Sequence, residues 1–304
     1  MNLKQLEMFS LVAALGSLSR AATATDTAQS LVSRQISQLE AEWGDRLFER
    51  TGRGMTLSEF GKRIQPEIEL VLDQVGRLES TVKDAARVLT GTVHLGVLPS
   101  MSRELLPVLF TNIRALAPDV RLHVTEGFSG DLDEQLGSGR LDMIVVNRYG
   151  ASNARHEDLL GVVDTFLIGR ADAMQALEPK ATLPFRTLAN LPLVLPSTPN
   201  GLRATLDMLG RQHNIWPNVV MEVDTLTAMK DVAMSGHAFT LLPLLAIKDE
   251  LEAGKLAATR VDRPAIRRTV ALSFTRHRPL SKAARLVGAR VRELVSDLIK
   301  NRQA

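Results

Sequence analysis

The chain has 304 residues, of which 45% are hydrophobic and 23% are charged, and it carries a formal net charge of +3 and no cysteine. This length allows two or three domains with separate cores, and the composition is typical of a soluble globular protein. The lack of cysteine excludes disulfides, thiolate metal sites and thiol redox sensing. No apolar run approaches the roughly 18–20 residues needed to cross a bilayer, and the charged N-terminus does not resemble a signal peptide, so we expect a cytoplasmic protein.

Charge is distributed unevenly along the chain. From Lys255 onward there are 13 Lys/Arg and 3 Asp/Glu, which leaves 24 basic against 31 acidic residues before that point. A nucleic-acid-binding region predicted from the isoelectric point alone would therefore fall at the C-terminus. We interpret this basic segment instead as a solvated face or a subunit contact.

Hydrophobic spacing predicts three helices near the N-terminus. Apolar residues over Leu3–Ala13 recur at helical intervals, and Gly16 and Ser17 end this helix. Ser17 is placed to cap a second, short helix over about Leu18–Ala24. A third helix is expected from about Ala28 to Trp43, where Gly44 ends it.

The third helix has two different faces. Its apolar side has Val32, Ile36, Leu39 and Trp43 at spacings of four, three and four. The opposite side carries small hydroxyls, which allow close approach to a partner, and one guanidinium, which can bond guanine edges or phosphate. Two helices joined by a tight turn, the second with such a face, are typical of a helix-turn-helix, although a generic three-helix core would show the same pattern. The candidate DNA-binding residues on this helix are Gln29, Ser30, Ser33, Arg34 and Ser37.

A hairpin is expected directly after these helices. Two short strand-like runs between Leu47 and Leu57 flank the sequence Thr51-Gly52-Arg53-Gly54, which is typical of a tight turn. The hairpin presents Arg50 and Arg53, and an arginine on a narrow tip suits the minor groove or the phosphates beside it. We predict that the hairpin is a wing and that both arginines contact DNA.

The same segment resembles a known family. The strings Ser33–Glu40 (SRQISQLE), Leu47–Arg50 (LFER) and Arg53–Gly61 (RGMTLSEFG) resemble the N-terminal signature of LysR-type transcriptional regulators. The resemblance covers about residues 2–90. It implies a winged helix-turn-helix that binds double-stranded DNA, followed by a linker helix through which two chains dimerise.

Three residues depart from the family pattern. Thr25 stands where the family usually has a core leucine, Ala28 where it has a capping serine or threonine, and Ser30 where it usually has proline. We expect the helix cap to shift to Thr27 or Asp26. The departures affect stability and base preference rather than the fold.

A long helix is expected next, with Ser58 as its cap and its end near Leu89. Its apolar residues are spaced alternately by four and three, as in the a/d seam of a coiled coil. A helix packed against its own domain would show the same stripe, whereas the family resemblance favours a dimer, in which two linked recognition helices gain avidity and read a palindrome. The residues of this seam are Ile64, Ile68, Val71, Val75, Leu78, Val82, Ala85 and Leu89.

After Gly91 and Thr92, strand-like runs alternate with amphipathic helical stretches. This alternation predicts an α/β sheet with helices on both faces. The expected strands are Val93–Val97, Val120–Thr125, Leu141–Val146, Phe166–Gly169, Leu193–Leu195, Val219–Val223, Phe239–Leu242 and Val270–Phe274. The expected helices include Arg103–Leu116, Leu202–Gln212, Thr225–Ser235 and Leu286–Ile299.

The C-terminal part extends the resemblance. Gly139–Val146 (GRLDMIVV) resembles a strand of the LysR-type sensor domain, which folds like a periplasmic binding protein with two lobes and two crossings between them. Pro192–Arg203 and Arg278–Ser281 further resemble the nitrogen-assimilation-control-like subgroup. The resemblance thus implies an α/β chain with a mostly α winged helix-turn-helix (1–57), a long linker helix (58–90) and a two-lobed α/β effector-binding domain (91–304). Lobe I comprises 91–162 plus 268–304, and lobe II comprises 163–267.

Polar residues at the expected strand ends form a candidate effector site. Ligands of such sheets bind beyond the C-terminal ends of strands, and hydroxyls, helix N-termini and arginines together favour a small organic anion. The same residue types are also common as helix caps and in turns. The candidate effector-binding residues are Ser100, Ser102, Phe128, Ser129, Asn147, Arg148, Ser197, Thr198, Arg203 and Thr225.

No catalytic or cofactor motif is found, and the six histidines lack metal-ligand spacing, so we expect neither an enzyme nor a cofactor or metal. The expected partners are double-stranded DNA, a small-molecule effector and further copies of the chain in a homodimer or homotetramer, but no membrane. Two alternatives stay open. A solute-binding protein would share the C-terminal fold but would not need residues 1–90. A regulator without an effector would use its C-terminal domain only for oligomerisation.

Overall fold

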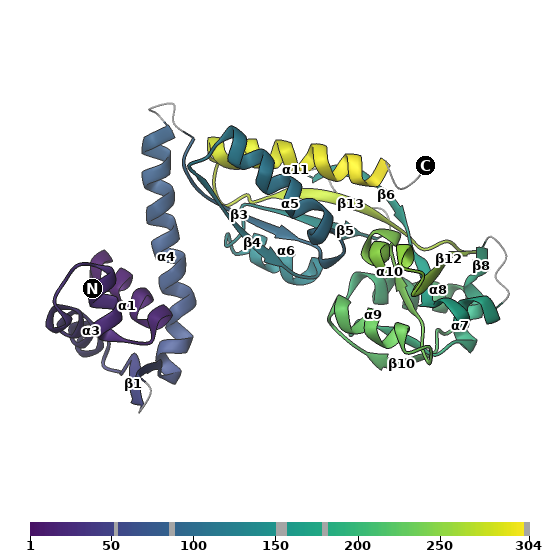
Figure 1. Ribbon diagram of the computed structural model, residues 1–304, viewed down its shortest axis with the longest axis horizontal. Helices are drawn as coiled ribbons and strands as arrows, with labels where there is room; N and C mark the ends of the chain where they lie inside the picture. Colours follow the sequence, from purple (N-terminus) through teal and green to yellow (C-terminus); the bar gives the residue numbers. More distant parts are fainter. Residues whose placement is uncertain (52–53, 85–88, 150–156, 178–181, 301–304) are drawn as a thin grey trace. The chain divides into compact units, whose positions relative to one another are not determined.

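The computed structural model describes residues 1–51, 54–84, 89–149, 157–177 and 182–300 (Figure 1). The chain forms two compact units, Met1–Val88 and Leu89–Ala304.

The first unit is a small helical domain with a two-stranded hairpin. Its elements are α1 (Leu3–Leu15), α2 (Leu18–Ala24), α3 (Gln29–Trp43), β1 (Phe48–Thr51), β2 (Gly54–Leu57) and α4 (Glu59–Asp84). The core is formed by apolar residues of every element, including Phe9 of α1 and Phe48 of β1, whose ring centroids lie 5.2 Å apart. Figure 1 shows the short helices beside the first half of α4, while its second half extends beyond them.

Local signals determine most of the helix ends. The Ser17 hydroxyl accepts a hydrogen bond from the Arg20 N–H, and Ser58 does the same for the Gly61 N–H at 2.9 Å. Gly16 and Gly44 end their helices in the left-handed conformation, which glycine adopts without a steric penalty.

The expected cap of α3 is wrong. Its N-cap residue is Ala28, which has no capping side chain. The Thr27 hydroxyl lies 2.9 Å from that of Thr25, which itself bonds the carbonyl oxygen of Ala21, and Asp26 adopts a positive φ in the turn. The turn between α2 and α3 thus uses the Thr27 hydroxyl, which was one of the two expected caps, and α3 lacks the roughly 1 kcal/mol that such a cap contributes.

The second unit contains a five-stranded sheet in the order β4-β3-β5-β13-β6. Strands β3, β4 and β5 are parallel, while β13 runs antiparallel to both β5 and β6. Helices α5 and α11 cover one face and α6 covers the other. The elements are β3 (Gly91–Val97), α5 (Pro99–Leu116), β4 (Val120–Glu126), α6 (Ser129–Gly137), β5 (Met143–Arg148), β6 (Glu157–Asp164), β13 (Arg267–Phe274) and α11 (Lys282–Lys300).

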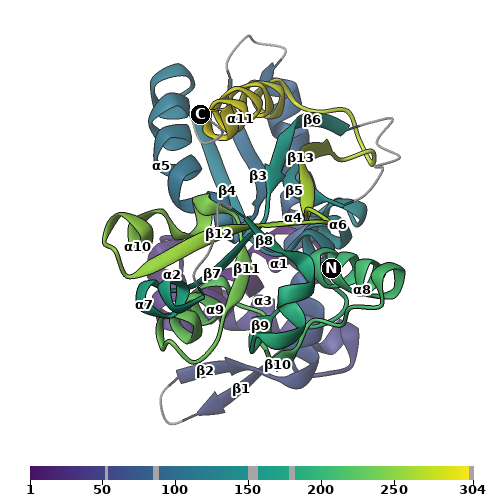
Figure 2. The same cartoon turned by 90° about the vertical axis from the view of Figure 1, so that its right-hand side faces the viewer.

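A second group of strands forms the other half of this unit. A four-stranded sheet has the order β11-β7-β12-β8, and β9 pairs with β10 in parallel. Figure 2 shows the two halves of the second unit one above the other. The elements are β7 (Phe166–Arg170), α7 (Ala171–Ala176), β8 (Thr182–Pro184), η1 (Phe185–Asn190), β9 (Leu193–Leu195), α8 (Gly201–His213), β10 (Val219–Glu222), α9 (Leu226–Met234), β11 (Thr240–Leu242), η2 (Leu244–Ile247), α10 (Lys248–Glu252) and β12 (Leu256–Asp262).

The chain passes twice between the two halves. Only Thr165 separates β6 of the first sheet from β7 of the second, and residues 263–266 separate β12 from β13. The crossing strands lie side by side, with Arg267 opposite Asp164 in the antiparallel register. The family resemblance implies two crossings between the lobes, and the structure has two.

The sequence did not predict β6, β8, β12, α6 or α7. In β6 the burial of side chains does not alternate, because the strand lies at the edge of its sheet, and β12 mixes polar and apolar residues. Periodicity alone could not identify such strands.

Part of the basic C-terminal segment pairs with acidic residues from earlier in the chain. Arg267 bonds Asp164 and Arg278 bonds Asp142, while Arg292 bonds Asp158. The interpretation of this segment as only a solvated face or subunit contact is therefore incomplete.

Candidate functional site

The predicted DNA-binding face of α3 exists as a continuous surface. Gln29, Ser30, Arg34 and Ser37 are exposed and Ser33 is half-buried, because Val32, Ile36 and Leu39 on the opposite face occupy the core. In the part of the chain that the structure describes, the Arg34 guanidinium has no hydrogen-bond or ion-pair partner. The face therefore offers one free guanidinium among small hydroxyls and an amide.

The hairpin is attached to the helices by specific bonds. The Glu40 carboxylate of α3 accepts the N–H groups of Leu47 (2.8 Å) and Phe48 (3.3 Å), and the N–H of Met55 donates to the Gly16 carbonyl oxygen at 2.9 Å. These bonds fix the hairpin relative to α3. Arg50 is exposed on β1, as expected, whereas Arg53 lies outside the described residues.

The stripe along α4 divides into two parts. Ile68 is 3% exposed and packs with Ile64 into the core of its own unit, as the alternative interpretation expected for this part. Further along, Val71 and Leu78 are 46% and 65% exposed, with the half-buried Val75 between them. Among the described side chains of α4, this second part is the one that exposes an apolar seam.

The last residues of the predicted seam do not extend it in the described structure. The side chain of Val82 is not described, and Ala85 lies outside the described residues. Leu89 packs against the core of the second unit, so its assignment to the seam is wrong.

Two adjoining cavities lie in the second unit. The first, which we name the strand-end cavity, has a volume of about 330 Å³ and lies at the carboxyl ends of β3, β5 and β9. Five predicted residues line it, namely Ser100, Phe128, Ser129, Asn147 and Ser197. The Ser129 hydroxyl accepts the Asn147 N–H at 3.0 Å, and Ser197 donates to Asp224 at 2.6 Å. Hydrogen bonds from the Ser197 hydroxyl and N–H lower the pKa of Asp224, which keeps this carboxylate charged at the rim.

The two predicted arginines do not line either cavity. Arg148 is held between Asp133 and Glu157, whose pKa is lowered by the hydrogen bonds from Arg148 although burial opposes the shift. Arg203 bonds Glu222 and lies 3.6 Å from Asp207. The expectation that these guanidinium groups face a ligand is therefore corrected, because carboxylates already occupy them.

Three other predicted residues lie away from the strand-end cavity. Ser102 is buried and donates to Glu126, and Thr225 caps α9 by accepting the Ala228 N–H. Both line a third cavity of about 500 Å³, which adjoins the strand-end cavity and shares Ser100 and Phe128 with it. Thr198 is exposed and lines neither cavity. Thr225 therefore has the capping role that the alternative interpretation expected, whereas the Ser102 hydroxyl is bonded to a carboxylate of β4.

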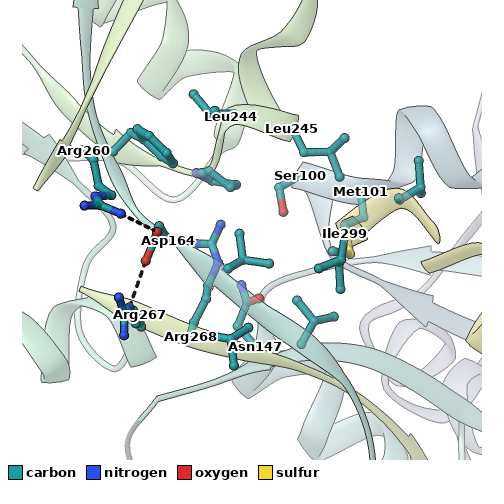
Figure 3. Close-up of a pocket in the computed structure, with 16 residues that line it drawn as sticks. Ser100, Met101, Asn147, Asp164, Leu244, Leu245, Arg260, Arg267, Arg268 and Ile299 are labelled. Carbon is teal, nitrogen blue, oxygen red and sulfur yellow. Dashed lines mark hydrogen bonds and ion pairs between the residues drawn. The ribbon is translucent and has the colours of Figure 1, made fainter. Parts of the chain in front are cut away.

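The second cavity, which we name the crossover cavity, is larger, at about 720 Å³. It lies against the crossing strands β6 and β13, between the start of α5, the end of α11 and η2 (Figure 3). It shares Ser100, Asn147 and Arg268 with the strand-end cavity. At its rim, Asp164 lies 3.1 Å from Arg267 and 3.5 Å from Arg260.

Arg268 was not predicted from the sequence. It follows the same alternation as Val270 and Leu272 on β13, whose side chains are buried, so its own side chain enters the interior. This alternation was the available signal, but the strand was expected to begin only at Val270. Among the described residues, no group of three or more His, Asp or Glu side chains is placed to hold a metal ion, and no helix is long and apolar enough to cross a membrane.

Comparison with known proteins identifies the family. Residues 86–296 match the LysR substrate binding domain, and residues 3–62 match the bacterial regulatory helix-turn-helix proteins of the lysR family. The chain belongs to the LysR family. This LysR-family protein is thus a DNA-binding transcriptional regulator with an effector-binding domain.

Similar proteins cover almost the whole LysR-family chain. The nitrogen assimilation regulatory protein nac of Klebsiella aerogenes is 26% identical over 298 residues, or 97% of this chain and 96% of that protein, which agrees with the subgroup resemblance. The regulator BbuR of Bordetella bronchiseptica is 29% identical over 83% of this chain and 77% of its own length.

Solved structures of LysR-family regulators show the same fold. CbnR complexed with its target DNA has a TM-score of 0.69 at 21% identity, covering 98% of this chain and 99% of CbnR. OxyR of Corynebacterium glutamicum has a TM-score of 0.60 at 22% identity, covering 99% and 94%.

Proposed function

We propose that this regulator reads a palindromic operator as a dimer and responds to a small organic anion bound between its two lobes. We assign DNA binding to residues 1–57, dimerisation to 58–90 and effector binding to 91–304, with lobe I at 91–162 plus 268–304 and lobe II at 163–267. Its place of action is the cytoplasm. The observation that carries the DNA-binding role is the exposed face of α3, on which Arg34 has no partner among the residues that the structure describes.

The geometry of α3 and the hairpin supports base reading. Arg34 has the donors to bond the O6 and N7 atoms of a guanine, and the hydroxyls beside it are short enough to let the helix enter a major groove. The exposed Arg50 on β1 is placed to contact backbone phosphates or the adjacent minor groove, and we propose the same role for Arg53. The bonds from Glu40 to the start of β1 would hold both elements in one orientation on the duplex.

Separate apolar surfaces support self-association beyond a dimer. On α4, Val71 and Leu78 are exposed, and a second α4 would bury them. The second unit exposes a different apolar set, consisting of Val108, Phe110 and Leu116 on α5, together with Trp216, Val220 and Met221 at or near β10. Two kinds of self-contact are what a homotetramer requires, and we propose that state.

The cavities support an effector more than a purely oligomeric role for the C-terminal domain. Their volumes of about 330 and 720 Å³ lie in the range of small-molecule sites. The start of α5 and one buried arginine lie at the wall that the two cavities share, and the start of α6 lines the strand-end cavity. Each of these features favours negative charge.

The test of DNA binding is a fluorescence anisotropy titration of duplexes from the protein's own promoter region, with a scrambled duplex as the control. We expect binding to the promoter to be at least a thousandfold tighter than to the scrambled duplex, as is typical of specific regulators. Equal affinity for both duplexes at physiological salt would contradict the proposed function.

A further inference from the structure

Arg268 is an unusual cation because it is buried without an ionic partner. Its exposed fraction is 6%, and its Nε atom is fully buried with no hydrogen-bond acceptor. No carboxylate in the described ranges forms an ion pair with it, although Arg260 and Arg267 nearby both contact Asp164. Its terminal Nη atoms are not among the fully buried atoms, so they reach the cavity that Arg268 lines. A largely buried cation without a carboxylate partner is costly, so an anion from outside the chain that binds these atoms would stabilise it.

The side chain is aimed into the crossover cavity. In Figure 3, Arg268 extends from β13 into the space between Asp164 and Ser100, with Asn147 beside it. The Ser100 hydroxyl and the Asn147 amide line the same cavity, and both groups are donors that suit an anion bound by Arg268.

Charge distinguishes the two cavities. The crossover cavity is lined by Arg260, Arg267 and Arg268 against the single Asp164, a formal balance of +2. The strand-end cavity has Arg268 against Asp131 and Asp224, a balance of −1. An anion is therefore favoured on the crossover side.

The rest of the crossover cavity is apolar. Around the polar wall are side chains from β6, β7, β13, α5, α11 and η2, and such a surface accommodates a hydrocarbon group. The apolar lining residues are Met101, Val162, Val163, Phe166, Pro243, Leu244, Leu245, Val270, Leu298 and Ile299.

We infer that the crossover cavity is a binding site for a carboxylate with an apolar body, of aryl or branched alkyl type, whose charge pairs with Arg268. The inference rests on the proposed effector role of the second unit and assigns the anion to this cavity rather than to the strand-end cavity. Because the cavity touches both crossing strands and η2, its occupant contacts both halves of the unit and is placed to bias their relative arrangement.

The experiment measures thermal stabilisation of the full-length protein by phenylacetate, with the uncharged isostere phenylacetamide as the ligand control. At ten times its Kd, phenylacetate should raise the wild-type Tm by about 3–6 °C. Phenylacetamide should have no comparable effect, because it cannot form the ion pair.

Matched variants identify the cavity. Arg268→Met and Leu298→Trp, which remove the cation and fill the crossover cavity, should abolish the phenylacetate shift. Arg203→Met, which removes a guanidinium paired with Glu222, and Leu226→Trp, which fills the strand-end cavity instead, should retain it.

Three outcomes would overturn the inference. They are no phenylacetate shift in the wild type, a shift that persists in Arg268→Met or Leu298→Trp, and a shift that only Leu226→Trp removes. The last outcome would place the ligand in the strand-end cavity and leave the proposed function intact. If the wild-type protein did not prefer the promoter duplex to the scrambled duplex, the proposed function would be refuted. The assignment of phenylacetate to the crossover cavity would not be affected.

Discussion

The two units of this regulator use arginine in opposite physical settings. On the α3 face Arg34 is exposed, so water solvates its charge and its lack of a protein partner costs little. In the described part of the second unit, Arg268 is buried and forms no ion pair, whereas Arg148, whose side chain is 21% exposed, lies between two carboxylates. An exposed arginine without a protein partner is therefore suited to reversible binding of DNA, because water solvates its charge when the DNA is absent. A buried arginine without a carboxylate partner indicates instead a binding site for a specific small ligand.

The largest expected effect is the loss of stability in Arg148→Met. This substitution leaves Glu157, whose side chain is 16% exposed, with the Ser273 hydrogen bond but without its ion-pair partner, and breaking a buried ion pair costs about 3 kcal/mol or more. Urea unfolding of the wild type and the variant at pH 7 measures the difference. Equal midpoints would mean that the Arg148 cluster contributes no net stability.

The seam on α4 gives the next test. Val71→Asp with Leu78→Asp places charges on a surface that is exposed in the single chain, so the monomer should fold while the dimer is destabilised. Sedimentation velocity should show a smaller species, and operator affinity should fall by at least tenfold because avidity is lost. The control is Lys62→Asp, at an exposed position of the same helix outside the apolar stripe. A double variant that remains the same size at micromolar concentration would show that chains pair elsewhere.

Arg34→Ala should have a smaller and more selective effect. Loss of a bidentate guanine contact should weaken operator binding by about 1–3 kcal/mol and relax the preference at one base pair. Arg50→Ala should instead reduce affinity evenly across sequences and lower the salt dependence. Anisotropy titrations against single-base operator variants distinguish the two, and an Arg34→Ala protein with unchanged affinity and preference would refute the assignment of α3.

The smallest expected effect is a dependence on pH. Because the pKa of Glu157 is lowered in the folded protein, its ionised form contributes stability above its ordinary value of 4.5, and this contribution is lost as the pH falls below it. The stability difference between the wild type and Glu157→Gln should thus be present at pH 7 and shrink below about pH 4.5. A difference that is the same at pH 7 and pH 3.5 would show that Glu157 does not act through its charge.

The sequence predicted the first unit better than the second for a physical reason. The ends of α2, α3 and α4 depend on residues within a few positions, such as Ser17, Gly44 and Ser58, and the face of α3 follows from its own periodicity. The cap of α3 was missed because Thr25 and Thr27 bond each other, a local choice that composition does not reveal.

In the second unit, the role of each arginine depends on distant residues. Arg203 was predicted to face the ligand, but folding brings it to Glu222, and Arg148 is taken by Asp133 and Glu157. Asp164, which lies on the paired strand next to Val163, the register partner of Arg268, forms ion pairs with Arg267 and Arg260 instead. Among the described residues, Arg268 thus has no carboxylate partner. No pattern along the chain encodes which guanidinium remains without a carboxylate.

The most direct test of the contrast between paired and unpaired arginines is the unfolding free energy of the ligand-free protein with the same substitution at both sites. Arg148→Met should destabilise by about 3 kcal/mol, whereas Arg268→Met should stabilise by roughly 1–3 kcal/mol, because it replaces an uncompensated buried charge with an apolar side chain. A loss of stability in Arg268→Met as large as that in Arg148→Met would show that Arg268 serves the fold, and would contradict the account of it as a cation reserved for a ligand.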